Sequence, residues 1–505
     1  MRPITLVLLL ILTAGCSSPA VFENYLPSAS PRAEWEIAQP TQEALPQTSG
    51  RAAVVTPPEM GVPLVAWDSG DGRYELLLAD PATGYLFPEH PAIGLGGSAD
   101  YAPQIARSPD GGLLAVTSGL GKACETAFGG LSCWPSADTL RLIDLRTWRE
   151  IETDLAAHFP PAYPPFKGWA SNLVFNRDAL KLALAYTERD VTTLALFDAR
   201  TGALIAKQPL DVRPRLMDFS ADGSSLAVYG SPVAETPGMA QPDPPSALLL
   251  DAVTLEVQWR TPLPAILDGT WCRENCAQLN ADTRMVYWSP AVVFDPVRNR
   301  MHILHADEDR LTTVDLRRRS SQSLEIRPAL TWIEQLLALT AGVAEAKYWP
   351  EGGYRSGVLL SDGRQIYTVG RTMDRFEEAN GEWTMNETSL GLTVIETDSG
   401  HELGTRASNA SRIRSSLDHR YLILDWGLTG SIEVLEAETL ELVGEVEGWE
   451  VLAGRRIDGQ EVFLLASQTG ERFDTPTRMA MLAPEPFEFM TPWSISGSAF
   501  WISAP

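Results

Sequence analysis

Residues 193–205 read Thr193-Leu194-Ala195-Leu196-Phe197-Asp198-Ala199-Arg200-Thr201-Gly202-Ala203-Leu204-Ile205. Strand-forming residues stand on both sides of a turn that begins with an aspartate and ends with a glycine. A carboxylate at the first turn position can accept hydrogen bonds from backbone N–H groups two residues on, and glycine adopts the positive φ that closes the turn. The stretch therefore predicts a hairpin between two strands.

This hairpin pattern occurs seven times along the chain. Its copies are centred on Asp80, Asp144, Asp198, Asp251, Asp315, Glu396 and Glu436. Subtracting these positions gives spacings of 64, 54, 53, 64, 81 and 40 residues. The shortest spacing is close to the roughly 40 to 45 residues that one four-stranded repeat takes, so the longer spacings indicate insertions between strands.

A second turn signal precedes most copies of the hairpin. It is clearest at Ser108-Pro109-Asp110-Gly111, Ser220-Ala221-Asp222-Gly223 and Ser361-Asp362-Gly363, and weaker at 176–178, 295–299 and 416–419. Each repeat thus predicts the order strand, acidic turn, strand, strand, Asp-x-x-Thr-Gly turn, strand, which is a four-stranded meander.

These repeats resemble the WD40-like and YVTN-type β-propellers of exported bacterial proteins, over about residues 55–505. The resemblance implies an all-β propeller domain, to which we assign residues 53–505. A last unit, with strands near 461–465 and 478–482 and a degenerate turn at 483–486, favours eight blades over seven. Residues 499–503 are expected to pair into the first blade and close the ring, which removes exposed sheet edges.

One helix is expected as an insertion in the ring. Apolar residues recur at helical spacing between Pro328 and Lys347, after a proline at a plausible first-turn position. Such a helix either caps the apolar mouth of the ring or offers a groove to a partner, because its amphipathic stripe fits both.

The N-terminus indicates export. An apolar run, Ile4 to Leu12, follows Arg2 and ends in Thr13-Ala14-Gly15-Cys16, and it is too short to span a bilayer. The segment ending at Cys16 resembles the lipobox of bacterial lipoproteins, which implies a signal peptide at 1–15 and acylation of Cys16. A secretory signal with a chance cysteine is the alternative. Residues 16–52 are rich in Pro and Ser and predict a flexible tether. The expected location is the extracytoplasmic side of a bacterial membrane.

Four further cysteines remain, which in an exported chain points to disulfides. They are Cys124, Cys133, Cys272 and Cys276. Three pairings are possible, and we favour Cys124 with Cys133 and Cys272 with Cys276, which close the shortest loops. A zinc site is a poor alternative, because no second ligand pair stands at metal spacing.

Aromatic residues mark one candidate binding region. The insertion 119–138 carries Trp134, and the neighbouring loop adds Tyr163 and Trp169 among prolines. Rigid aromatic side chains on loops can stack on a sugar or anchor a partner protein. The alternative is that the loop packs its own aromatic residues, as loops of this length usually do.

Histidines and acids crowd together only at His302-Ile303-Leu304-His305-Ala306-Asp307-Glu308-Asp309. On a strand, His302 and His305 point to opposite faces and cannot share a metal ion. The three acids could bind calcium, but a solvated hairpin turn fits them better, because the spaced ligand array of calcium loops is missing. We therefore expect no metal site. Arg317-Arg318-Arg319 is likewise predicted to be a solvated turn.

Composition excludes one class of partner. The formal charge of -25 argues against nucleic acid, whose phosphates need a clustered basic surface. No Gly-x-Ser-x-Gly elbow, His-Glu-x-x-His helix or phosphate-binding Gly-rich loop occurs. Asp251, Thr254 and Trp259 resemble one docking motif of quinoprotein propellers, but the other copies lack the tryptophan, so no cofactor is expected.

Two functions follow from these patterns. The first is a non-enzymatic binding or scaffold lipoprotein that holds a protein or a glycan at the membrane. The second is a propeller enzyme, such as a glycoside hydrolase, lyase or quinoprotein, with its site in the central funnel. Paired acids with perturbed pKa values at the funnel would favour the enzyme, and an apolar or plugged funnel would favour the scaffold.

Overall fold

The computed structural model describes residues 62–500 with gaps, the longest at 328–351 and others at 97–102, 160–167, 233–240, 275–283 and 469–476. Residues 1–61 and 501–505 and several shorter stretches also lie outside the described residues. The predicted signal peptide, Cys16, the tether and the helix predicted between Pro328 and Lys347 therefore remain predictions.

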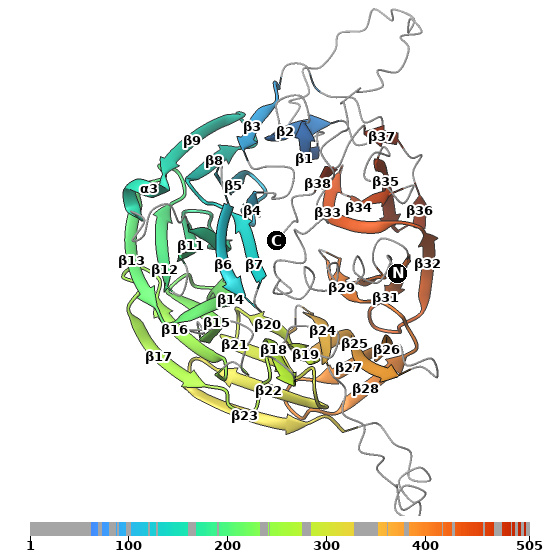
Figure 1. The fold of residues 1–505 in the computed structure, drawn as a ribbon. Helices are drawn as coiled ribbons and strands as arrows, with labels where there is room; N and C mark the ends of the chain where they lie inside the picture. Colours follow the sequence, from blue (N-terminus) through green and yellow to red (C-terminus); the bar gives the residue numbers. More distant parts are fainter. Residues whose placement is uncertain are drawn as a thin grey trace, which may run out of the picture.

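The described strands form sheets arranged around a common centre, as Figure 1 shows. Eight of these sheets contain an antiparallel four-stranded meander, and we number them blades 1 to 8 in chain order. The all-β class and the propeller architecture are confirmed. The blade count of the complete ring stays a prediction, because connections between blades lie outside the described residues.

The blades follow one another along the chain. Blade 1 is β38 (Ala499–Phe500), β1 (Val62–Asp68), β2 (Arg73–Ala79) and β3 (Ile93–Gly96); blade 2 is β4 (Gln104–Arg107), β5 (Leu113–Ser118), β8 (Thr139–Asp144) and β9 (Arg149–Asp154). Blade 3 is β10 (Trp169–Phe175), β11 (Lys181–Glu188), β12 (Val191–Asp198) and β13 (Leu204–Leu210); blade 4 is β14 (Val212–Phe219), β15 (Ser225–Pro232), β16 (Ser246–Asp251) and β17 (Val257–Pro262).

The second half of the chain repeats this order. Blade 5 is β20 (Ala291–Asp295), β21 (Arg300–Leu304), β22 (Arg310–Asp315) and β23 (Ser320–Glu325); blade 6 is β24 (Gly352–Leu359), β25 (Gln365–Glu377), β27 (Leu392–Glu396) and β28 (Glu402–Arg406). Blade 7 is β29 (Arg412–Ser415), β30 (Tyr421–Asp425), β31 (Ser431–Glu436) and β32 (Leu442–Glu447); blade 8 is β33 (Glu450–Ile457), β34 (Gln460–Gln468), β35 (Thr477–Pro484) and β36 (Phe487–Phe489), with β37 (Trp493–Ile495) paired to β35.

The ring has two unlike faces, because the strands of each blade alternate in direction. The tight turns between first and second strands and between third and fourth strands lie at one end, which we call the turn face. Backbone and side-chain bonds join the turns of neighbouring blades there, as from Ala221 N to Pro296 O at 3.0 Å and from Lys181 Nζ to Ala252 O at 2.9 Å. The connections between second and third strands and between blades lie at the opposite end, the loop face.

Three strand insertions arise at the loop face. They are the hairpin β6 (Lys122–Ala127) and β7 (Gly130–Pro135), the hairpin β18 (Gly269–Glu274) and β19 (Arg284–Ser289), and β26 (Trp383–Ser389), which pairs with the extended end of β25. β19 joins β24 by parallel pairing, with Tyr287 opposite Gly352 and Ser289 opposite Tyr354. The β18–β19 hairpin therefore extends the sheet of blade 6 beyond β24 (Figure 1).

The turns reproduce the sequence pattern in detail. Asp198 Oδ1 accepts hydrogen bonds from the N–H groups of Arg200 and Thr201, at 3.0 and 2.8 Å. The residue four positions after the acid has a positive φ in six blades, although it is glycine only at Gly202 and Gly400. The other four are Trp148, Leu255, Arg319 and Leu440.

The core lies between blades. Leu194 and Leu196 of blade 3 pack with Val228 and Leu248 of blade 4, all at most 1% exposed. Each such side chain contributes roughly 1.5–3 kcal/mol on burial, and the contact exists only between neighbours. As predicted, the end of the chain closes the ring, because Phe500 of β38 pairs with Val65 of β1.

The only helix among the described residues is short and was not predicted. It is α3 (Leu155–His158), which begins at the N-cap Asp154, whose Oδ1 accepts from Ala156 N at 2.9 Å. Within the described part of the chain, no helix has the length and apolar character needed to cross a bilayer.

Candidate functional site

A buried arginine holds both ends of the β18–β19 hairpin. Arg215, at the bulge in the middle of β14, forms an ion pair with Asp268, the residue before β18, and donates to Ser289 Oγ, at the end of β19, at 3.1 Å. The Asp268 side chain is fully buried and also accepts from Tyr229 Oη at 2.8 Å. Desolvation lowers the pKa of Arg215 and raises the pKa of Tyr229. We call this set the arginine clamp.

Tyrosines and arginines gather beside the clamp, around the place where β19 joins β24. Burial raises the pKa of Tyr354 to about 12, against the opposing charges of Arg371 and Arg412. Tyr287 lies close enough to act on Tyr354, and its own pKa is raised by burial and lowered by the charge of Arg215. Both tyrosines are partly exposed. We call Tyr287, Tyr354, Arg371 and Arg412 the Tyr–Arg patch.

Hydrogen bonds hold one arginine of this patch in place. Arg371 Nη1 pairs with Glu387 Oε2 of β26 at 2.7 Å, and its Nη2 donates to Asn409 O, between blades 6 and 7, at 2.6 Å. Tyr and Arg are the residue types most enriched at binding hot spots, because they offer large contact area and several donors at fixed geometry. The patch thus combines residue types that are common at binding hot spots.

A pair of carboxylates occupies the neighbouring blades 7 and 8. Burial raises the pKa of Glu450 to about 7, the negative charge of Asp425 adds to this, and Arg412 and Arg414 oppose it. Asp425 is fully buried, accepts weakly from Val451 N at 3.4 Å and pairs in register with Arg412. A carboxyl with a pKa near 7 can act as a general acid or base.

In the predicted histidine cluster, a carboxylate, the His305 imidazole and two hydroxyls lie in a row, and hydrogen bonds join the imidazole to the hydroxyls. Glu308 Oε1 lies 3.3 Å from His305 Nδ1, His305 Nε2 lies 2.8 Å from Thr312 Oγ1, and Thr312 Oγ1 lies 2.8 Å from Ser323 Oγ. The order acid, imidazole, hydroxyl is that of a nucleophilic triad. Thr312 is only 3% exposed, however, so a substrate cannot reach it, and burial lowers the pKa of His305 to about 4. We therefore assign this row of side chains a structural role within blade 5.

The His302 side chain, on β21, lies on the opposite face of the sheet from His305. Its Nδ1 is 2.9 Å from Thr313 Oγ1, and burial lowers its pKa to about 4. The two histidines thus contact adjacent residues of β22, as expected if they point to opposite faces.

Asp309 pairs with Arg355 of β24 at 2.7 Å, which ties blade 5 to blade 6. Among the described residues, no three His, Cys, Asp or Glu side chains are grouped to hold a metal ion.

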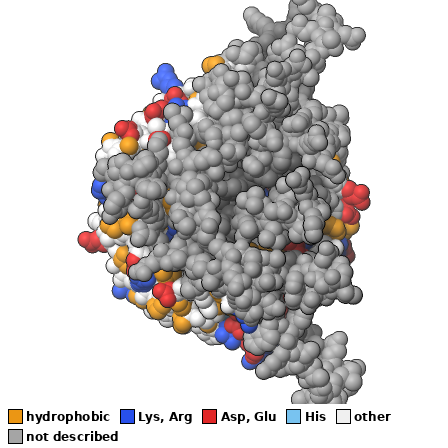
Figure 2. Space-filling view, in the orientation of Figure 1, with side chains coloured by type: hydrophobic (Ala, Val, Ile, Leu, Met, Phe, Trp, Pro, Cys, Tyr) orange, Lys and Arg blue, Asp and Glu red, His pale blue; other side chains and the backbone are white. Residues whose placement is uncertain are grey.

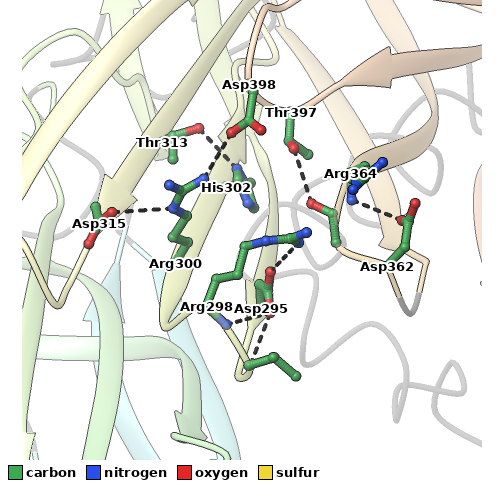
Figure 3. A network of polar contacts seen from close by, with 12 residues as sticks. Asp295, Arg298, Arg300, His302, Thr313, Asp315, Asp362, Arg364, Thr397 and Asp398 are labelled. Atoms are coloured by element: carbon green, nitrogen blue, oxygen red, sulfur yellow. Dashed lines mark hydrogen bonds and ion pairs between the residues drawn. The ribbon is translucent and has the colours of Figure 1, made fainter.

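A second polar network links the same two blades nearer the turn face (Figure 3). Arg300 pairs with Asp315 at 3.3 Å and with Asp398 of blade 6 at 2.9 Å. Arg298 pairs with Asp295 at 3.0 Å within the first turn of blade 5. These contacts orient the turns of the two blades. Around the rim of the ring, hydrophobic, basic and acidic side chains are interspersed (Figure 2).

Of the three predicted aromatic site residues, the structure describes the side chain of Trp169 alone. Trp169 begins β10, is 4% exposed and lies under the Arg213 guanidinium, 5.3 Å from the ring centroid. Packing accounts for this tryptophan. Tyr163 lies outside the described residues, as does the side chain of Trp134 on β7. A binding role for these aromatic residues stays a prediction.

The cysteines are placed in part too. Cys124 and Cys133 are directly opposite in the β6–β7 hairpin, which is the backbone register that their predicted bond requires. Cys272 of β18 is disulfide-bonded. Cys276 lies outside the described residues, so both pairings stay predictions.

Sequence reasoning missed the arginine clamp and the Tyr–Arg patch. Arg215, Tyr287, Tyr354 and Arg412 come from four strands that are far apart in the chain. No local pattern distinguishes them from other exposed polar residues. The one usable signal was the long interval between the copies at Asp251 and Asp315, which indicated an insertion there.

Comparisons with known proteins add little beyond architecture. Neither a protein-family model nor a curated protein matches the chain. Among solved structures, it is similar to dihydro-heme d1 dehydrogenase NirN in complex with DHE (14% identity, 94% of this chain and 82% of that one, TM-score 0.49). It is also similar to the Dos1 propeller (10%, 78% and 84%, 0.43) and to quinohemoprotein alcohol dehydrogenase ADHIIG from Pseudomonas putida HK5 (10%, 79% and 69%, 0.41).

Proposed function

We propose that the chain is a lipid-anchored propeller of the bacterial cell envelope that binds a protein or glycan partner through the Tyr–Arg patch, without catalysing a reaction. The lipid is attached at Cys16, and the tether holds the ring outside the membrane. Several acyl chains, each contributing about 0.8 kcal/mol per buried CH₂, anchor such a protein without a spanning helix.

The observation that carries this proposal is the composition of the Tyr–Arg patch and its position at the loop face. Partly exposed Tyr287 and Tyr354 stand between arginines that neighbouring elements hold in place, as Glu387 and Asn409 hold Arg371. The described strand insertions also arise at this face. Preorganised side chains lose little entropy when a partner binds.

The arginine clamp supports the same reading. The β18–β19 hairpin that it holds extends the sheet of blade 6 beyond β24, and Trp271 and Trp288 of this hairpin are buried beside Ala306 of blade 5. The clamp therefore fixes the element that carries Tyr287 of the Tyr–Arg patch. Among the described residues, the triad-like row at His305 is buried around Thr312.

A second candidate function rests on Asp425 and Glu450. A glycoside hydrolase or lyase needs one carboxyl that is protonated near neutral pH beside one that is ionised, and the raised pKa of Glu450 fits the first role. For this candidate, Glu450→Gln must abolish turnover of a polysaccharide or glycan substrate while leaving substrate binding intact.

The binding proposal is tested with the full chain. Purified protein is cross-linked in detergent-solubilised envelopes and, separately, sedimented with purified peptidoglycan. We expect one stoichiometric partner in one of the two assays, and about 30-fold weaker binding for Tyr354→Ala and for Arg371→Ala, the loss typical of a hot-spot residue. Arg200→Gln is the control, because Arg200 is exposed on a turn of blade 3.

Two results would refute the proposal. Binding that is equal for wild type, Tyr354→Ala and Arg371→Ala would remove the patch as the binding site. Absence of any stoichiometric partner in both assays would remove the scaffold function. The anchor is tested separately by metabolic labelling with a fatty acid, which we expect for wild type and not for Cys16→Ser.

A further inference from the structure

We infer that the turn face of blade 5 docks on an anionic membrane surface, so that the ring lies with its loop face directed away from the membrane. This inference rests on the proposed lipid anchor, and it concerns a different surface from the Tyr–Arg patch. It follows from a concentration of arginines, from their exposure, and from the face at which the chain enters the ring.

The two turns of blade 5 are basic in a strongly acidic protein. Residues 295–300 and 315–319 contain five arginines and two aspartates, a local charge of +3 by subtraction, whereas the whole chain carries -25. The corresponding turns of blade 7, at 416–421 and 436–440, contain one arginine and three acids. The basic character is therefore a property of blade 5 and not of the turn motif.

The arginines of blade 5 project from a fixed frame. Arg317 Nη2 donates to Val297 O at 2.9 Å, which joins the second turn of the blade to the first. The Arg318 side chain is 78% exposed, and Arg319 is also exposed. Val297 is 62% exposed, the highest value among the large apolar residues that are exposed in the described chain. We call Val297, Arg317, Arg318 and Arg319 the basic patch.

The aspartates of these turns are already engaged. Asp295 accepts from the N–H groups of Val297 and Arg298 at 3.0 Å each and pairs with the Arg298 side chain (Figure 3). Asp315 accepts from Arg318 N at 2.8 Å and pairs with Arg300. The side chains of Arg317 and Arg319 have no carboxylate partner among the described residues. Their charge is therefore free to act on an anionic surface.

The chain enters the ring at the same face. Val62, the first residue of β1, pairs with Ala79, the last residue of β2 before the turn at Asp80, so β1 begins at the turn face. Residues 1–61, which carry the proposed anchor, therefore join the ring from that face. In Figure 1, β1 and the β22–β23 hairpin lie on opposite sides of the ring. An anchor on one side and a basic patch on the other give two attachments that fix the orientation.

The occupant is a lipid surface and not a folded partner. Arginines and one exposed valine on tight turns match a layer of phosphate headgroups above hydrocarbon. Each arginine near such a surface strengthens binding by roughly fivefold, so three give about 100-fold. Tethering then makes even weak docking effective, because the anchored ring is held at high local concentration.

The test uses the full chain carrying Cys16→Ser, so that the acyl anchor does not mask docking. Co-sedimentation is measured with vesicles of phosphatidylcholine alone and of phosphatidylcholine mixed with phosphatidylglycerol, at low ionic strength. We expect binding only to the phosphatidylglycerol vesicles, weakened by added salt. Arg317→Gln, Arg318→Gln and Arg319→Gln combined should weaken it about 100-fold.

The matched control removes the same number of charges elsewhere. Lys207→Gln, Arg260→Gln and Arg273→Gln change exposed cations of β13, β17 and β18 near the loop face, and the combined variant should bind vesicles as wild type does. Equal losses in the two triple variants would overturn the inference, as would absence of phosphatidylglycerol-dependent binding by the starting chain.

The two proposals fail in different ways. If the docking inference is wrong, the basic-patch variant binds vesicles as wild type does, whatever Tyr354→Ala does to the partner. If the proposed partner function is wrong, Tyr354→Ala has no effect on partner binding, while vesicle binding still depends on the basic patch.

Discussion

Removal of the Asp268 carboxylate tests the arginine clamp most directly. In Asp268→Asn, the Arg215 guanidinium keeps its charge in a site where its side chain is 13% exposed. Breaking a buried ion pair by removing one partner costs about 3–5 kcal/mol, because the remaining charge is left uncompensated. Tyr229 also loses its carboxylate acceptor. We therefore expect the free energy of unfolding to fall by about 3 kcal/mol or more.

The loss should appear first in the β18–β19 hairpin, because Arg215 holds both of its ends. Since 1.4 kcal/mol is a factor of ten, 3 kcal/mol corresponds to at least about a 100-fold increase in local opening. Amide hydrogen exchange of residues 269–274 and 284–289 measures this opening. The strands of blades 2 and 3 serve as an internal reference and should exchange as in wild type.

Two variants complete this experiment. Arg215→Met combined with Asp268→Asn removes both charges and should recover at least half of the loss. Arg260→Gln breaks an exposed pair with Asp211, whose side chains are 37% and 67% exposed, and should change stability by under about 1 kcal/mol. If Asp268→Asn were as stable as the Arg260→Gln control and the hairpin kept its protection, the clamp would have no energetic role.

Three further predictions concern stability in urea unfolding. Burial lowers the pKa of His302 and of His305 to about 4 from an ordinary 6.5, so their contribution to the free energy of unfolding is present above pH 6.5 and is lost as the pH falls, by about 2 kcal/mol each at pH 5. His302→Gln should therefore lose less stability on acidification than wild type. Burial raises the pKa of Glu450 to about 7, so its contribution to the free energy of unfolding is present below pH 4.5 and lost as the pH rises through 7. Relative to wild type, Glu450→Gln should gain roughly 2 to 3 kcal/mol of stability between pH 5 and pH 8. A difference in stability that does not depend on pH would contradict this. Arg319 has φ of 56° on an exposed turn, so Arg319→Gly should stabilise by about 1 kcal/mol, and a loss of that size would contradict the strain argument.

The fold could be predicted because its information is local and repeated. The acid of each third-to-fourth-strand turn accepts the backbone bonds expected of it, as Asp198 does from Arg200 and Thr201. The turn does not need glycine at its end, since Trp148 and Leu255 take the same positive φ as Gly202. Leu255 is fully buried, so interblade packing offsets its backbone strain. Tertiary contacts thus decide what the turn motif alone cannot.

The candidate site could not be predicted, because it depends on contacts between distant strands. Tyr287 and Tyr354 have ordinary sequence neighbours and become close only through the β19–β24 pairing. The predicted aromatic region illustrates the converse: Trp169 looked available in the sequence, yet Arg213 and the fold cover it. The missed helix α3 has only four residues, too few to show a periodicity.

The parallel pairing of β19 with β24 has a consequence for how the ring folds. In a plain repeat array each unit interacts only with its immediate neighbours, and stability is a sum of nearest-neighbour contributions. Here a segment that follows blade 4 in the chain passes blade 5 and completes the sheet of blade 6. Blade 5 therefore cannot detach without displacing a strand of another unit, which makes blades 4 to 6 a single cooperative block within an otherwise modular ring.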